Sequence, residues 1–225
     1  MIKGEIIIFS SIDNIVESLK KIVINLNDKK SLEDYNVFNY LLGLSQNSLY
    51  QFPFQCKKWD SPSPDFLVEY NHNNPVGIET THVTVNFHFK NMKDHDNIPG
   101  SFVESSSNGR SYLRKADEQF CSEPYYGNQA EKLWVEIAMK EYRKKREKFI
   151  KPFFRKETEN VLLIRNFTSL PIKHKNIPAV INAFYDNIKY EFNNSNTFNE
   201  ITVIWGDNRI FRNINGIRSD LIVNI

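Results

Sequence analysis

The feature that most constrains the fold is the segment Pro64–Val85, PDFLVEYNHNNPVGIETTHVTV. Two runs rich in β-branched and aromatic residues flank the polar stretch Asn71–Pro75. This composition is typical of two strands joined by a turn. The sequence therefore predicts a hairpin whose strands are Asp65–Tyr70 and Gly77–Val85.

Each predicted strand carries an acid. Side chains alternate across a strand, so Glu79 and Thr81 should share one face. Asp65, at the start of the first strand, and Glu79, on the second, can converge on one point. One or two carboxylates, completed by water and phosphate oxygens, form the ligand set that Mg²⁺ takes, and a metal held there can activate water against a phosphodiester. The alternative to a metal site is structural: Asp65 would be a turn residue that follows Pro64, and Glu79 would be a solvated strand residue.

A basic segment dominates the charge distribution. Lys140–Glu157 holds nine Lys or Arg and three Glu, a local net charge of +6, whereas the whole chain carries +2. Such a concentration is typical of a protein that binds a polyanion. Arg143, Lys145 and Lys148 are the candidate nucleic-acid contacts in this segment, and a solvated helix face is the alternative.

The same region predicts the strongest helix of the chain, Gln129–Ile150. Leu133, Ile137, Lys140 and Lys144 fall on one stripe of a helix with 3.6 residues per turn. The position of two lysines on the same stripe as apolar residues requires a structural or functional explanation. An ion pair between Glu136 and Lys140 is one such explanation, because residues four apart are neighbours on a helix.

The other expected elements follow from periodicity and from turn residues. Length and composition favour one soluble domain covering residues 1–225. The expected elements are a strand at Glu5–Phe9, a helix from a cap at Ser11 to Leu26, a helix from a cap at Ser31 to Leu44, a loop at Gln51–Ser63, an irregular insertion at 87–129, a buried strand at Thr158–Arg165, a helix at Pro178–Phe192, and a hairpin at Ile201–Asn213.

The pattern Pro64-Asp65-Phe66, a turn, then Gly77-Ile78-Glu79-Thr80-Thr81 resembles the active-site hairpin of the PD-(D/E)xK, or restriction-endonuclease-like, nuclease superfamily. The resemblance covers roughly Leu32–Ile164. Thr81 stands where the family motif has lysine. Some members carry E-x-T or supply the lysine from a following helix.

The resemblance implies an α/β fold with an αβββαβ core, a central mixed sheet flanked by helices, a long insertion, and a C-terminal helix plus hairpin. It implies a Mg²⁺-dependent or Mn²⁺-dependent endonuclease acting on DNA, with RNA as the alternative, and is compatible with defence against foreign DNA. Asp65 and Glu79 would hold metal, with Glu33 as a further acid, and Thr81 would place a metal-bound water. Lys140, or else Lys144, would replace the motif lysine. Arg110 and Arg114 would approach phosphates from the insertion.

Other features narrow the possible classes. Cys56 and Cys121 lie far apart, which indicates neither a zinc site nor a disulfide framework. No run approaches the ~20 apolar residues of a membrane span, and the start lacks the pattern of a signal peptide, so we expect a cytoplasmic protein. Cutting both strands usually takes two active sites, which favours a homodimer or a partner subunit. An inactive nucleic-acid-binding module and a protein-interaction subunit remain the alternatives to an enzyme.

Overall fold

The computed structural model divides the chain into two compact units. The first comprises Met1–Thr81, Tyr142–Asn166 and Ile188–Ile225, and the second comprises His82–Glu141 and Phe167–Asn187. The structure describes residues 4–22, 29–59, 64–70, 74–84, 102–105, 111–114, 119–121, 127–168, 170–192, 196–206 and 208–224.

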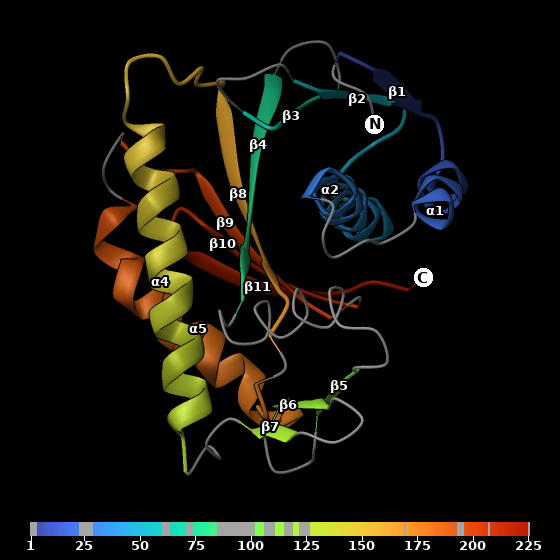
Figure 1. Cartoon of the computed structure of the whole chain (residues 1–225). Helices are drawn as coiled ribbons and strands as arrows, with labels where there is room; N and C mark the ends of the chain where they lie inside the picture. Colours follow the sequence, from blue (N-terminus) through green and yellow to red (C-terminus); the bar gives the residue numbers. More distant parts are fainter. Residues whose placement is uncertain are drawn as a thin grey trace. The chain divides into compact units, whose positions relative to one another are not determined.

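A mixed sheet of eight strands forms the centre of the fold (Figure 1). Its order is β1-β2-β3-β4-β8-β9-β10-β11. Pairing is antiparallel from β1 to β4 and from β9 to β11, whereas β8 and β9 run parallel. The predicted α/β class and mixed sheet are confirmed. The strands are β1 Ile6–Phe9, β2 Phe54–Lys58, β3 Phe66–Tyr70, β4 Asn74–Val83, β8 Glu159–Asn166, β9 Glu200–Trp205, β10 Arg209–Ile214 and β11 Ile217–Ile222.

The predicted central hairpin is confirmed as β3 and β4, but its turn is shorter than predicted, because Asn74 and Pro75 belong to β4 and pair with Tyr70 and Glu69. These strands pair antiparallel, with Phe66 opposite Ile78 and Val68 opposite Val76. The four side chains are fully buried and belong to the main core. The hydrophobic face of the hairpin therefore fixes its register, since a slip of one residue would turn this set out of the core.

Two helices, α1 (Ile12–Lys21) and α2 (Lys29–Gln46), pack against that core face. The Ser11 hydroxyl caps α1 as predicted, accepting a hydrogen bond from the Asn14 amide at 3.3 Å. The predicted cap of α2 is wrong, because the helix already includes Ser31 in its first turn. A serine is tolerated there because the first-turn amides have no partners within the helix in any case.

Helix α2 is buried throughout from Leu32 to Ser45. Its close approach to the sheet depends on Gly43, where a Cβ atom would lie 2.5 Å from Ile210 Cδ1 and 2.9 Å from Val223 Cγ2. This helix is thus held between the strands and the C-terminal residues of the first unit.

The segment Gln51–Ser63, predicted to be a loop, contains strand β2. Phe54 and Cys56 face the core while Gln55 and Lys57 lie on the other side. The run is short and follows Pro53 directly, and the residues after it are rich in Ser and Pro, so the composition of the segment resembles that of a loop. Pairing with β1 on one side and β3 on the other decides the outcome.

The later elements follow the predicted order closely. Helix α4 (Gln129–Phe149), strand β8, helix α5 (Ile177–Ile188) and the β9–β10 hairpin are all present. Strand β11 was not anticipated. Short 3₁₀ turns cover His174–Asn176 and Lys189–Glu191. Three strands from the predicted insertion form a separate small sheet in the second unit; these are β5 Phe102–Ser105, β6 Ser111–Arg114 and β7 Gln119–Cys121.

In the second unit, α5 packs against the first turns of α4. The Trp134 and Phe184 rings meet edge to face with centroids 6.1 Å apart, and the Asn176 amide donates to Glu131 Oε1 at 3.0 Å. Among the described helices, none has the length and apolar character needed to cross a membrane.

Candidate active site

The candidate site begins with Glu79, near the middle of β4. Val76 and Ile78 face the core beneath α2, so strand alternation directs Glu79 and Thr81 to the opposite face of the sheet. The Glu79 side chain is 1% exposed, and Thr81 is also buried. A carboxylate buried to this degree needs charged or hydrogen-bonding partners.

Asp65 lies immediately before β3, beside the same part of β4. Its Oδ2 atom accepts hydrogen bonds from the Thr80 amide at 2.8 Å and from the Thr80 hydroxyl at 3.1 Å. Pro64, which precedes it, is buried. The carboxylate is therefore held in one position by the neighbouring strand, and about a fifth of it stays exposed (19%).

Two lysines from the last turns of α4 reach these acids. The Nζ atoms of Lys145 and Lys148 lie 2.6 and 2.8 Å from Glu79 Oε1. Lys145 Nζ also lies 4.0 Å from Asp65 Oδ2. Residues three apart fall on one face of a helix, which explains why both lysines reach the same carboxylate. Both acids thus face the ammonium group of Lys145.

The electrostatics of the site keep Lys145 charged. Burial lowers the pKa of Lys145, but the negative charges of Glu79 and Asp65, the hydrogen bond to Glu79 and the charge of Glu33 raise it, and the net pKa lies above its ordinary value. An amine with such a pKa is a cation at neutral pH. Lys145 can therefore stabilise negative charge or donate a proton there, but it cannot serve as a general base.

One oxygen of Glu79 remains without a partner. Both lysines contact Oε1, whereas Oε2 is buried and has no hydrogen bond among the residues that the structure describes. An unpaired buried carboxylate oxygen is costly, because it has lost its water without gaining a replacement. Such an atom is available to a further ligand.

Glu33, predicted as a third acid, lies in the first turns of α2 and is buried. Its Oε2 atom is 3.6 Å from Lys58 Nζ, which also contacts Asp34 Oδ1 at 2.7 Å. Glu33 acts on Lys145 through its charge. Its side chain also pairs with Lys58, so Glu33 takes part in a neighbouring buried ion-pair cluster.

The other candidate residues lie away from these contacts or outside the described part. Lys140, Arg143 and Lys144 are exposed on α4. Arg110 lies outside the described residues, and only the backbone of Arg114 is described, in β6. The lysines that contact Glu79 are Lys145 and Lys148, which the sequence predicts as nucleic-acid contacts, and not Lys140 or Lys144.

The phase of α4 explains this outcome. Its buried stripe is one residue later than predicted, because Leu133 and Ile137 are only half-buried. Lys145 falls on that stripe, four residues before Phe149. The sequence signal that identifies it is therefore a lysine interrupting an otherwise apolar stripe. The buried members of the stripe are Ala130, Trp134, Ala138, Tyr142 and Phe149.

The described residues contain no group of three or more His, Cys, Asp or Glu that could hold a metal by itself. Mg²⁺ does not need such a group, because it is usually bound by one or two carboxylates together with waters and substrate phosphate oxygens. Asp65, partly exposed, and the unpaired Oε2 of Glu79 fit that requirement.

Comparisons of the chain with protein-family models, with curated proteins and with solved structures give no match.

Proposed function

We propose that this protein is a metal-dependent nuclease that hydrolyses phosphodiester bonds, with DNA as its substrate. The observation that carries the proposal is the convergence of Asp65 and Glu79 on the protonated Lys145, with one Glu79 oxygen left unpaired in a buried position. Two carboxylates beside a protonated lysine offer metal ligands and a positive charge, which together stabilise an attack on an anionic diester.

The order of the elements supports a restriction-endonuclease-like core. Along the chain, α2, β2, β3, β4, α4 and β8 occur in the sequence αβββαβ, with β5 to β7 inserted before α4. In the sheet, β2, β3, β4 and β8 are consecutive neighbours. The two acids lie on the central hairpin of this set and the lysines lie on its second helix, the positions expected for a member that has lost the motif lysine.

Each residue then has a role that its surroundings allow. Asp65 and Glu79 would bind Mg²⁺ or Mn²⁺, which when bound supplies an activated water and neutralises the leaving oxygen. Lys145 would stabilise the charge that develops on the phosphoryl oxygens. Thr81, two residues after Glu79 on the same face, would orient water. Lys148, the more exposed of the two lysines, would turn from Glu79 to a substrate phosphate.

The test is an assay of cutting and retention on plasmid and single-stranded DNA, with Mg²⁺, Mn²⁺ or EDTA. Asp65→Asn should remove metal-dependent cutting. Lys145→Met should reduce it by about 10²- to 10³-fold, the cost of removing one preorganised group that stabilises transition-state charge. Lys140→Met is the matched control, because it removes an exposed lysine of the same helix, and it should cut like the wild type. Full activity of a clean Asp65→Asn preparation would eliminate the proposal.

A binding module without catalysis is the second candidate. It is favoured by the two ammonium groups that already neutralise Glu79 Oε1. Such a protein would retain DNA equally with metal or EDTA, and its affinity would fall steeply with salt. If the protein neither cuts nor retains DNA, the result would indicate a protein-interaction subunit whose basic helix binds an acidic partner.

A further inference from the structure

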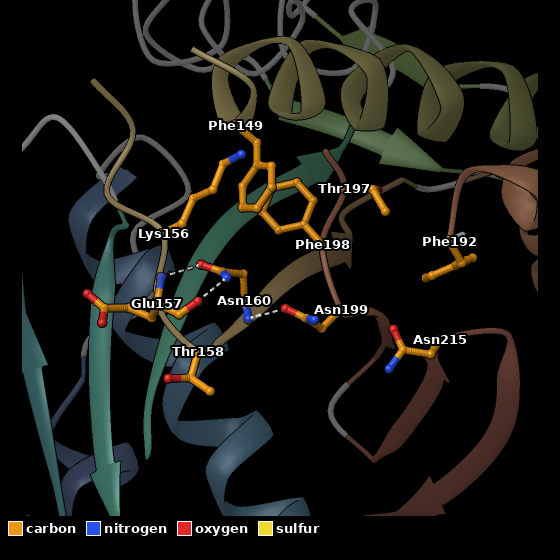
Figure 2. A pocket seen from close by; sticks show the side chains of 10 residues that line it. All are labelled: Phe149, Lys156, Glu157, Thr158, Asn160, Phe192, Thr197, Phe198, Asn199 and Asn215. Atoms are coloured by element: carbon orange, nitrogen blue, oxygen red, sulfur yellow. Dashed lines mark hydrogen bonds between the residues drawn. The ribbon is translucent and has the colours of Figure 1, made fainter. Parts of the chain in front are cut away.

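A cavity of about 370 Å³ lies in the first unit, between the end of α4 and the segments that lead into β8 and β9 (Figure 2). It is distinct from the carboxylate site, since neither acid nor either lysine of that site lines it. Its volume is at the lower end of the range typical of small-molecule pockets, which suits a single ring system.

The apolar part of the cavity is aromatic. Phe149 and Phe198 are buried, with ring centroids 4.5 Å apart, and Phe192 lines the cavity as a half-buried side chain. In Figure 2, Phe192 stands across the cavity from the other two rings. Phe149 and Phe198 are each only 1% exposed and form the buried base of the cavity, so Phe192 is the ring that can offer a face to a flat ligand.

The polar part offers side-chain amides, of which Asn199 is half-buried and Asn215 is exposed. Both polar atoms of the Asn160 side chain are hydrogen-bonded, since Oδ1 accepts from the Glu157 backbone amide at 3.0 Å and Nδ2 donates to the Glu157 carbonyl at 2.7 Å. The backbone amide of Asn160 donates to Asn199 Oδ1 at 2.8 Å. The Nδ2 group of Asn199 and the whole side-chain amide of Asn215 make no hydrogen bond within the described part of the chain. They remain available to a ligand.

The cavity adjoins the carboxylate site through two separate elements. Phe149 directly follows Lys148, which contacts Glu79. On the hairpin, Gly77 packs so closely on the cavity wall that a Cβ would lie 3.2 Å from Glu157 Cγ and 3.3 Å from Asn160 Oδ1. Gly77 is two residues from Glu79. Two short stretches of the first unit therefore link residues at the cavity to residues at the carboxylate site.

We propose that this cavity binds one unstacked nucleobase of the nucleic-acid strand whose phosphate lies at Asp65 and Glu79. The inference rests on the proposed function and adds to it how the strand is positioned. Proteins that hold a base outside its stack combine aromatic stacking with hydrogen bonds to the base edge, which are the two groups of residues found here. Lys156, whose Nζ lies 4.7 Å from the Phe149 ring centroid, supplies a cation for an adjoining phosphate.

Other ligand classes fit the lining less well. A purely apolar ligand would cover the half-buried amide of Asn199 without giving it a partner, which is unfavourable. A free anion would meet one lysine, Lys156, beside the carboxylate of Glu157, and would gain nothing from the Phe192 ring. A nucleobase uses the Phe192 ring and the amides together.

The experiment measures binding of the full chain in EDTA, so that cutting plays no part. The probes are a fluorescent oligothymidylate and an oligomer of equal length that lacks all bases, both followed by anisotropy. The wild type should prefer the base-containing probe by about tenfold, in line with the stacking of one base. Phe192→Leu should remove most of that preference while leaving affinity for the base-free probe unchanged.

Two further variants sharpen the result. Asn215→Gly removes the free amide, and glycine tolerates the left-handed backbone at this position (φ +48°), so the variant should fold and lose about threefold of the preference. Phe153→Leu is the matched control, because Phe153 is 58% exposed and lies outside the cavity. It should keep the wild-type preference. An oligomer containing 5-iodouracil should cross-link under ultraviolet light to a cavity phenylalanine.

Equal behaviour of Phe192→Leu and Phe153→Leu, or cross-links only outside the cavity, would overturn the base pocket. Displacement of the strand by thymidine monophosphate at equal concentration would also overturn it, in favour of a free-nucleotide site. The two proposals can fail separately. Metal-dependent cutting without any preference for the base-containing probe would support the nuclease and contradict the base pocket. Base-dependent binding without cutting would support the base pocket and contradict the nuclease.

Discussion

The first unit contains two buried glutamates on the same sheet, Glu79 on β4 and Glu200 on β9, and they are treated very differently. Glu200 accepts four hydrogen bonds. Tyr40 and Thr202 bind Oε1 at 3.0 and 2.5 Å, and Arg212 binds both oxygens at 2.8 and 2.7 Å. Among the residues that the structure describes, the two cations that contact Glu79 both lie at Oε1, and Oε2 has no partner.

The two glutamates also differ in the kind of cation that contacts them. Arg212 is buried and bidentate, which fixes the geometry of its pair with Glu200. The side chains of Lys145 and Lys148 are 17% and 36% exposed, and each lysine can rotate into water. A fully satisfied network stabilises the fold, whereas a half-satisfied carboxylate with movable partners is suited to binding something else.

The largest expected effect follows from replacing each glutamate by glutamine. Glu200→Gln leaves the Arg212 charge buried without its counter-ion and should lower the free energy of unfolding by about 3–5 kcal/mol. Glu79→Gln should change it by less than about 1 kcal/mol, because its lysines can be hydrated. Urea unfolding of both variants measures the difference. An equally large loss at Glu79 would show that its ion pairs are structural.

A second pair of variants compares the packing around the two glutamates. Gly43→Ala forces a methyl group into Ile210 and Val223, near the strand that carries Arg212, and should cost about 1–3 kcal/mol through overpacking. Gly77→Ala meets side-chain atoms of Glu157 and Pro64 at 3.2 Å. Because Glu157 can shift, we expect a cost below about 1 kcal/mol there. Thermal unfolding tests the order, and a larger loss at Gly77 would contradict it.

The smallest effect concerns pH. The folded pKa of Lys145 is raised, so its ion pairs contribute stability that is fully present below the unfolded pKa of about 10.4 and is lost as the pH rises through the folded pKa. The difference in unfolding free energy between the wild type and Lys145→Met should therefore stay constant from neutral pH to about pH 9.5 and shrink above pH 10.4. A decline already near pH 8 would mean that the lysine titrates there.

Local patterns were sufficient for elements with strong periodicity or clear turn signals. The β3–β4 hairpin, the extent of α4 and the buried strand β8 follow from their own residues. They were not sufficient for β2, because five residues that directly follow Pro53 carry too little pattern to outweigh the loop composition of the segment. That strand exists because β1 and β3 pair with both of its edges.

The sequence by itself determined that Asp65 lies at the entrance of the strand next to the one that carries Glu79, and that Thr81 shares a face with Glu79, since strand alternation depends only on spacing. The sequence could not determine which lysine of α4 contacts these acids. A residue on α4 turns by about 100° per position, so the choice between Lys144 and Lys145 depends on which stripe the helix buries. Only the packing of the large side chains Tyr142 and Phe149 in the tertiary structure decided that phase.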